Sequence, residues 1–117
     1  MSAIDKILEV QSILIEQLGS DITSFTLNKS GKELKFILIS GIVLYIVYND
    51  YDQYSYSIIY TQSKYDRIRY DNFDDRWDVV TRPHHLHIRG SNKTEQSEMT
   101  GLPNSDMLTF LEILNEK

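Results

Sequence analysis

The sequence contains no cysteine, and this absence excludes several kinds of chemistry at once. Without thiols the chain can form no disulfide bond, build no thiolate metal site and use no cysteine nucleophile. A chain without cysteine fits a reducing compartment, and we expect a cytoplasmic protein. The first residues agree with this expectation, because they lack the basic region and the apolar stretch of a signal peptide.

The chain also lacks an apolar stretch long enough to cross a bilayer. Its longest apolar run, residues 36–48, includes Ser40 and Gly41 and falls short of the ~20 residues that a membrane-spanning helix needs. We interpret this run as buried strand and expect no membrane association. The net charge of −5 provides no general attraction to nucleic acid. Any contact with RNA therefore requires a local basic patch.

What the sequence does contain predicts a single α+β domain over residues 1–117. The hydrophobic fraction of 41% is enough to build a core. Apolar residues at helical spacing predict an amphipathic helix from Ser2 to Leu18, which Gly19 closes. Alternating, β-branched and aromatic residues then predict strands in residues 22–28, 34–38, 42–48, 54–61, 65–71 and 84–89.

The last part of the chain predicts a polar loop followed by a short helix. Residues 90–101 are polar, and we expect them to form a mobile loop. Pro103 suits the start of a helix, with Asn104 or Ser105 as its cap. Short connections between consecutive strands favour an antiparallel meander of about five to six strands, with both helices packed on one face. The exposed edges of such a meander would permit a homodimer.

Arginine and histidine are confined to one short segment of the chain. All five arginines and all three histidines lie between positions 67 and 89, whereas the lysines are scattered. Arginine binds phosphate or carboxylate through its planar, bidentate guanidinium group. Histidine is the side chain whose ordinary pKa allows proton transfer near neutral pH. If the protein performs chemistry, we expect it in this segment.

Strand geometry relates these side chains to one another. On a strand, His85, His87 and Arg89 would project from one face at a spacing of roughly 6.5–7 Å, while Leu86 and Ile88 would point into the core. Two histidines could act as base and acid on the attacking and leaving oxygens of a phosphodiester, and an arginine could stabilise the transition state. The remaining candidates are His84 for catalysis and, for phosphate binding, Arg67, Arg69 and Arg82.

Two other interpretations of this segment remain open at this point. The same residues can form a solvated strand edge in which arginine and histidine pair with aspartate. They can also form a metal site, because His85 and His87 have a chelating spacing on a strand, which His84 or an aspartate could complete. The absence of thiolates and of an obvious acidic cage favours chemistry without a metal or another cofactor.

Three short elements of the sequence resemble the TumE-type toxin family. They are Tyr54-Ser55-Tyr56, Ile68-Arg69-Tyr70-Asp71-Asn72 and Pro83-His84-His85-Leu86-His87. The resemblance extends over roughly residues 44–117, and the histidine element is its more specific part. Carried over by position, the resemblance supplies these motif residues: Arg69, Tyr70, Asp71, Asn72, Pro83, His84, His85 and His87.

The resemblance implies a toxin of a type II toxin–antitoxin module, encoded beside a helix-turn-helix antitoxin, but it supplies no reaction. The family often continues the Asp-Asn element with Ala-Pro-His-His, whereas Phe73-Asp74-Asp75-Arg76-Trp77 follows here, so that one pair of histidines is absent.

Our leading hypothesis combines the two lines of reasoning. The protein would be a toxin that acts as a metal-independent ribonuclease, with His85 and His87 as acid and base. Arg69, Arg82 and Arg89 would hold phosphate. A first alternative is a non-catalytic module that binds protein or nucleic acid. A second alternative is a divalent-metal enzyme that uses His85 and His87.

Overall fold

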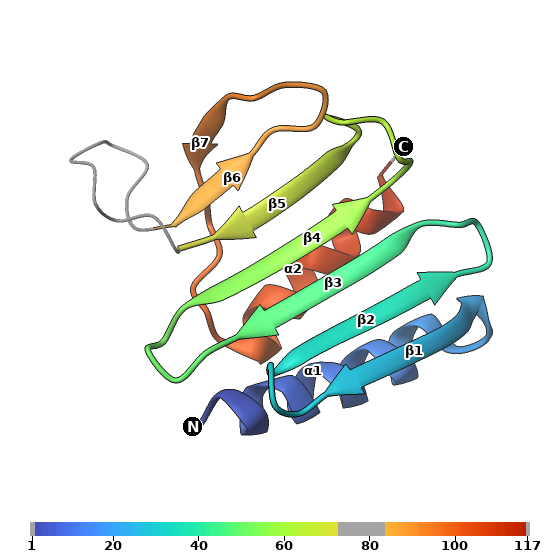
Figure 1. Cartoon of the computed structure of the whole chain (residues 1–117), viewed down its shortest axis with the longest axis vertical. Helices are drawn as coiled ribbons and strands as arrows, with labels where there is room; N and C mark the ends of the chain where they lie inside the picture. The colour runs from blue at the N-terminus through green and yellow to red at the C-terminus, as the bar shows by residue number, and fades with distance from the viewer. Residues whose placement is uncertain (1, 73–83, 117) are drawn as a thin grey trace.

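The computed structural model describes residues 2–72 and 84–116 (Figure 1). Two residues that the sequence analysis singled out, Arg82 and Pro83, lie outside the described residues. The same holds for residues 73–77, in which the sequence departs from the family pattern.

Helix α1 (Ala3–Leu18) begins and ends with local signals in the sequence. The Ser2 hydroxyl accepts a hydrogen bond from the Asp5 N–H at 3.2 Å, and the Asp5 carboxylate accepts one from the Ser2 N–H at 3.4 Å. This reciprocal capping box satisfies N–H groups that have no partner within the helix. Gly19 ends the helix with a φ of 50°, a conformation in which glycine meets no steric cost. The predicted helix is confirmed, with Ser2 as its cap.

In the described part of the chain, seven strands form one antiparallel sheet in chain order, and each strand pairs with the next (Figure 1). A 3-10 turn, η1 (Gly19–Asp21), leads from α1 into the sheet. The strands are β1 (Ile22–Asn28), β2 (Glu33–Leu38), β3 (Val43–Tyr48), β4 (Tyr54–Ile59), β5 (Arg67–Asp71), β6 (His85–His87) and β7 (Thr94–Gln96). The predicted α+β class and the meander are therefore confirmed, with seven strands in place of the expected five to six.

Two of the predicted boundaries near the end of the sheet are wrong. Strand β6 has three residues and does not extend over positions 84–89. Strand β7 lies within residues 90–101, which were predicted to be loop, and its Glu95 pairs with Leu86 of β6. All three residues of β7 are exposed and polar. This strand therefore has no hydrophobic alternation, and only its pairing with β6 identifies it.

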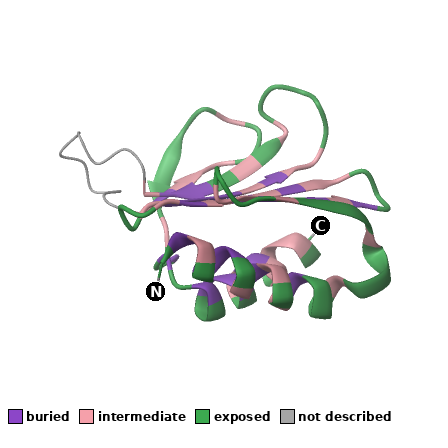
Figure 2. Ribbon diagram, turned by 60° about the horizontal axis from the view of Figure 1, so that its bottom comes forward, coloured by how far each residue is buried: buried purple, intermediate pink, exposed green. Residues whose placement is uncertain are grey.

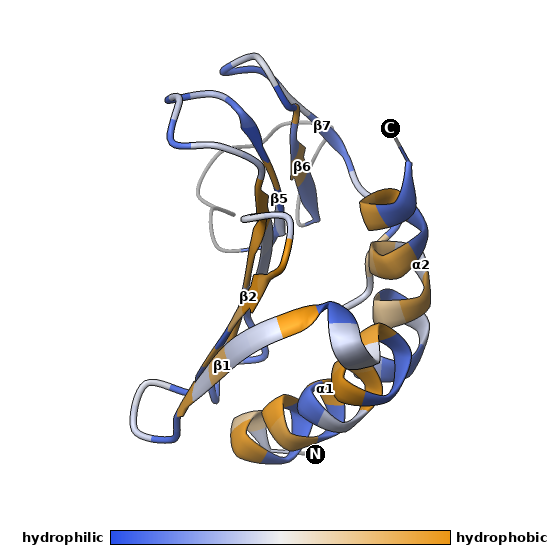
Figure 3. Cartoon of the chain, turned by 90° about the vertical axis from the view of Figure 1, so that its right-hand side faces the viewer, coloured by the Kyte–Doolittle hydropathy of each residue, from blue (hydrophilic) through white to orange (hydrophobic). Residues whose placement is uncertain are grey.

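Helix α2 (Pro103–Asn115) ends the chain, with Pro103 in its first turn as predicted. Asn104 and Ser105 lie inside this helix, so the expectation that one of them caps it is wrong; Leu102 occupies the cap position and makes no side-chain hydrogen bond there. Both helices cover the same face of the sheet and leave the other face open, as Figures 2 and 3 show. Neither helix within the described residues is long and apolar enough to serve as a membrane span.

The hydrophobic core lies between the sheet and the two helices. On β2 and β3 the buried residues alternate with more exposed ones, which is the pattern of strands with one covered face. On β4 and β5 two residues of the open face, Ser55 and Asp71, are buried as well. The buried strand residues of the covered face are Leu34, Phe36, Leu38, Leu44, Ile46, Tyr48, Tyr54, Tyr56, Ile58 and Tyr70. Across the open face, a row of paired residues runs through Lys35, Tyr45, Ser57, Arg69, His87 and Thr94.

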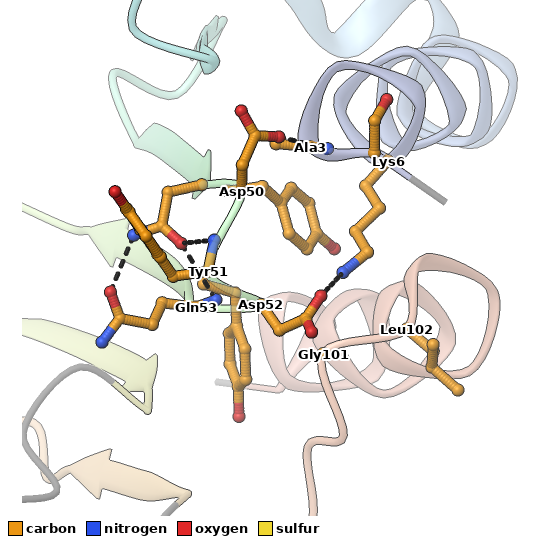
Figure 4. Close-up of polar contacts among 12 residues, drawn as sticks. Ala3, Lys6, Asp50, Tyr51, Asp52, Gln53, Gly101 and Leu102 are labelled. Carbon is orange, nitrogen blue, oxygen red and sulfur yellow. Dashed lines mark hydrogen bonds and ion pairs between the residues drawn. The ribbon is translucent and has the colours of Figure 1, made fainter.

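The loop between β3 and β4, residues 49–53, makes polar contacts with the first turn of α1 (Figure 4). Asp50 Oδ1 accepts a hydrogen bond from the Ala3 N–H at 3.2 Å, and a carboxylate at a helix N-terminus interacts favourably with the helix dipole. Lys6 Nζ lies 3.4 Å from Asp52 Oδ1. These contacts hold α1 against the sheet at the end where the helix begins.

Candidate functional site

The pairing of β5 with β6 brings four polar side chains together on the open face of the sheet. Arg69 stands opposite His87, and Asp71 stands opposite His85. Directly opposed residues of an antiparallel pair share a face. The intervening pair, Tyr70 and Leu86, therefore faces the helices, where Tyr70 is buried and Leu86 packs against the core.

Asp71 is the centre of this group, which we call the Asp71 cluster (Arg69, Asp71, His85 and His87). Its side chain is buried, and Oδ2 lies 2.7 Å from Arg69 Nε and 3.0 Å from His87 Nε2. Oδ1 lies 3.4 Å from His85 Nδ1. Burial raises the pKa of Asp71, but the hydrogen bond from His87 and the charges of His87, Arg69 and His85 outweigh it, so that the pKa falls below its usual value. Asp71 is therefore ionised at neutral pH.

The two histidines of the cluster differ in their access to solvent. The side chain of His85 is 7% exposed, whereas that of His87 is 34% exposed and that of Arg69 is 49% exposed. A substrate that approaches the open face can therefore reach His87 and Arg69. His85 is buried, and its ring lies against the Asp71 carboxylate. This exposure separates the roles of two residues that the sequence analysis treated alike.

The contacts of His87 also distinguish its two ring nitrogens. Nε2 faces the Asp71 carboxylate, so we assign the proton to Nε2, which then donates to Oδ2. Arg69 Nη2, which can only donate, lies 3.2 Å from the same nitrogen and forms no hydrogen bond with it in this tautomer. This tautomer leaves Nδ1 as the nitrogen that can take up a proton. A carboxylate that orients an imidazole and stabilises its protonated form is the arrangement that nucleophilic and acid–base sites share.

A groove of about 340 Å³ adjoins the cluster on the open face. Among the residues that the structure describes, every charged residue of its lining is basic, and the lining includes no aspartate or glutamate. These basic residues are Lys64, Arg67 and Arg69, and His87 lines the groove beside them. On a chain whose net charge is −5, this groove is the kind of local basic patch that a contact with a polyanion requires.

Arg67 lines this groove next to the cluster, but Arg89 does not belong to it. Arg89 Nε lies 2.7 Å from Asp66 Oδ1, and the Arg89 guanidinium carbon lies 3.6 Å from the centre of the Tyr60 ring. The predicted row of His85, His87 and Arg89 on one strand is wrong, because β6 ends at His87. Beyond that point the chain turns, and Gly90 adopts a φ of 79°. The same turn makes Ile88 line the groove, whereas the sequence predicted it in the core.

His84 lies apart from the Asp71 cluster, against the covered face of the sheet. Its Nδ1 is 2.9 Å from the hydroxyl of Tyr54, and the two rings stack with their centres 5.8 Å apart. Tyr54 is a fully buried residue of that face. The structure therefore places His84 in contact with the core, and it does not bring this residue together with His85 and His87.

Two further motif residues, Tyr70 and Asn72, hold the strands in place. Tyr70 is buried in the core, and burial raises its pKa to about 12. Asn72 Oδ1 accepts a hydrogen bond from the Tyr54 N–H at 2.8 Å, and its Nδ2 donates to the Asp52 carbonyl at 3.0 Å. Asn72 thus connects the end of β5 to the start of β4. Of the Arg-Tyr-Asp-Asn element, Arg69 and Asp71 face the open side, and the other two residues support them.

Two features of the site were not predicted from the sequence. The first is the central position of Asp71, which the motif supplied only as a supporting residue; its spacing of two from Arg69 was the signal that could have found it. The second is the contribution of the turns beside the sheet, where Lys64, Tyr65 and Asn92 line the groove. These residues belong to different hairpins, and no local pattern connects them.

The cluster also bears on the predicted metal site. His85 Nδ1 lies 3.4 Å from one oxygen of the Asp71 carboxylate and His87 Nε2 lies 3.0 Å from the other, so this carboxylate engages both nitrogens. In residues 2–72 and 84–116, no group of three or more histidine, aspartate or glutamate side chains is arranged to hold a metal ion.

The comparison with known families assigns the chain to a family. The family described as Toxin TumE matches residues 5–116, which extends the resemblance seen in residues 44–117 to nearly the whole chain. Neither the curated proteins nor the solved structures include a match. The match covers α1 from Asp5 onward, the whole sheet and α2. The chain therefore belongs to the TumE toxin family.

Proposed function

We propose that this toxin cleaves RNA without a metal ion, with His87 as the proton-transfer group. Membership of a toxin family supports the broader role, a toxin of a toxin–antitoxin system that has an antitoxin as its partner. The reaction itself rests on one observation. A solvent-accessible histidine is held by a buried, ionised carboxylate, and it lines a groove whose described charged residues are all basic.

The chemistry follows from the positions of these groups. His87 Nδ1 takes the proton of a ribose 2′-hydroxyl, which attacks the adjacent phosphorus and forms a cyclic phosphate. Asp71 stabilises the imidazolium that results, because its carboxylate lies 3.0 Å from Nε2. Arg69 is half exposed beside His87 and neutralises charge on the phosphoryl oxygens. The 5′-oxygen leaves with a proton from the imidazolium or from water.

His85 takes a different part from the one that the sequence predicts. Its side chain is buried, and both histidine rings contact the same carboxylate, with ring centres 6.3 Å apart. Two histidines on the same carboxylate do not flank a phosphodiester from opposite sides. We therefore propose His87 as the catalytic residue and His85 as a residue that positions Asp71.

Induced expression of four chains tests this function: the wild type, His87→Ala, His85→Ala and His84→Ala. We expect the wild type to stop growth and to degrade RNA, and the His87→Ala chain to lose both effects. Loss of a general acid–base group lowers a rate by about 10²- to 10⁴-fold. The His84→Ala chain is the matched control, because it removes a neighbouring histidine from the opposite face.

The measurements are growth after induction, integrity of total RNA, and cleavage of a labelled RNA by purified protein in the presence of a chelator. Growth arrest with intact RNA would contradict the proposal, as would equal toxicity of the His87→Ala chain. If His87→Ala abolishes arrest and the wild type cleaves no RNA, the result favours a non-catalytic toxin that binds its target through this surface.

The partners follow from the same assignment. We propose a helix-turn-helix antitoxin and a cytoplasmic site of action. We also propose a homodimer through β1, because this edge strand contains no charged residue and exposes 46% of Phe25. Edge strands without charges are prone to pair with another chain. Co-purification with the product of the adjacent gene and light scattering of the isolated toxin test these two assemblies.

A further inference from the structure

We propose that the basic groove holds one nucleotide of a single-stranded RNA, with the base stacked on Tyr65 and the phosphate bound by Arg67 and Arg69. This inference rests on the proposed function and adds a subsite to it. Tyr65 and Arg67 both line the groove, and Tyr65 is 42% exposed. An exposed aromatic ring between basic side chains is the usual platform for a base of single-stranded nucleic acid.

Two neighbouring hairpin turns form the wall of the groove. Tyr65 belongs to the turn between β4 and β5, and Ser91 and Asn92 belong to the turn between β6 and β7. The Gly90 N–H donates to the Tyr65 carbonyl at 2.6 Å, which joins the two turns through the backbone. The pair of Arg89 with Asp66 adds a second connection at 2.7 Å. The backbone that carries Tyr65 is thus positioned before a ligand binds.

The distribution of charge supports a phosphate-bearing ligand. Lys64 Nζ lies 5.2 Å from the centre of the Tyr65 ring, which adds a positive charge close to the proposed stacking residue. A second groove of about 370 Å³, between the sheet and α2, is rich in acids. Its lining includes Glu95, Glu98, Glu112 and Glu116. A polyanion would therefore be repelled from that groove and attracted to the one beside Tyr65.

The polar residues of the groove suit the rest of a nucleotide. Ser57 lies on β4 below the groove, and Ser91 and Asn92 face it from the opposite turn. Hydroxyl and amide groups can each donate and accept hydrogen bonds to a ribose or a base edge. A volume of about 340 Å³ lies at the lower end of the range for small-ligand sites, so one nucleotide is the appropriate size.

The groove shares two residues with the catalytic cluster. Arg69 and His87 line the groove and also contact Asp71. A nucleotide on Tyr65 would therefore place its phosphate beside His87, where the proposed cleavage takes place. Stacking alone tolerates any of the four bases. This subsite would therefore position the RNA strand in the groove and would select little for its sequence.

A binding measurement with RNA that cannot be cleaved tests the subsite separately from catalysis. The probes are fluorescent 2′-O-methyl hexanucleotides, one of each base, which have no free 2′-hydroxyl. We expect Tyr65→Leu to weaken binding by about 5- to 100-fold, the range for loss of one base–aromatic stack, and Tyr65→Phe to bind as the wild type does. Arg67→Ala should weaken binding and reduce the salt dependence by about one phosphate contact.

The matched control is Tyr51→Leu, which removes a more exposed tyrosine from the loop between β3 and β4 (Figure 4). It should bind as the wild type does. The subsite is overturned if the wild type binds none of the probes, or if Tyr65→Leu binds as well as Tyr51→Leu. If Tyr65-dependent binding is found but natural RNA is not cleaved, the subsite stands and the ribonuclease proposal fails.

Discussion

Two aspartates of this protein are buried to a similar degree, yet their surroundings give them different parts to play. Asp106, on the covered face, is 1% exposed, and Asp71, on the open face, is 2% exposed. Asp106 lies in α2 and accepts hydrogen bonds from neutral donors, which belong to the core and to the segment just before this helix. Asp71 instead contacts one arginine and two histidines, and two of these side chains, Arg69 and His87, are partly exposed to solvent.

The partners of Asp106 make it a structural residue. Its carboxylate accepts from the N–H groups of Thr100 and Gly101 at 2.9 Å and 2.6 Å, and from the Tyr56 hydroxyl at 2.7 Å. Tyr56 is in turn 2.7 Å from the Tyr48 hydroxyl. Burial raises the pKa of both tyrosines far above the ordinary value, so both hydroxyls keep their protons. This network connects the sheet to α2 and leaves no group for chemistry.

Burial alone therefore does not identify a functional carboxylate. A buried carboxylate needs partners in either case. Neutral donors from the backbone and from tyrosine hold a helix in place. Partners that titrate and reach the surface allow the carboxylate to act on a bound molecule. Substitutions in each network can test this distinction.

The largest loss of stability is expected from Asp106→Asn. The amide nitrogen of asparagine donates hydrogen bonds and cannot accept those of the Gly101 N–H and the Tyr56 hydroxyl. At least one buried donor would therefore lose its acceptor. Such a loss costs about 1–3 kcal/mol for each unpaired group. We expect a decrease of roughly 3 kcal/mol in the free energy of unfolding, measured by urea denaturation. A decrease below about 1 kcal/mol would show that the network contributes little to stability.

A smaller loss of stability and a large loss of activity are expected from Asp71→Asn. The partners Arg69 and His87 reach solvent, which lowers the cost to about 1–2 kcal/mol. RNA cleavage should fall by about 10- to 10⁴-fold, because an amide neither orients the imidazole correctly nor stabilises its charged form. Urea denaturation and cleavage of a labelled RNA measure the two effects. Unchanged cleavage would remove Asp71 from the proposed mechanism.

The pH dependence of this variant gives a separate test. The pKa of Asp71 lies below its usual value of 3.8 in the folded state, so the ionised carboxylate favours folding. This contribution is complete above about pH 5 and is lost as the pH falls through the folded-state pKa. The stability difference between wild type and Asp71→Asn should therefore shrink below about pH 4. A difference that grows as the pH falls would contradict the direction of the pKa shift.

The smallest effect is expected from His84→Ala. This change removes one hydrogen bond and one stacking contact with Tyr54, for a loss of about 1 kcal/mol in stability. RNA cleavage should stay within about twofold of the wild type, because His84 lies on the covered side. Denaturation and cleavage assays on the same preparation check both values. A large loss of RNA cleavage with unchanged stability would indicate that His84 takes part in catalysis, contrary to this prediction.

Much of the fold can be predicted from the sequence, because the relevant signals are local. Helix α1 has an apolar face and a capping box within its own residues. Strand β4 alternates Tyr54, Tyr56 and Ile58 with serine and isoleucine, so its covered face can be read directly. Strand β7 has no such signal, since Thr94 to Gln96 are exposed on both faces. Its existence depends on the backbone groups that β6 offers to it.

The candidate site follows the same division. The spacing of Arg69 from Asp71, and of His85 from His87, is a local property, and the sequence by itself places each pair on one face of its strand. The register between β5 and β6 was decided by the tertiary structure, because the two strands are separated by residues 72–84 and no local pattern fixes their alignment. In that register Asp71 pairs with His85 and Arg69 pairs with His87 across the two strands. Pairing across the sheet therefore turned two local patterns into a single site.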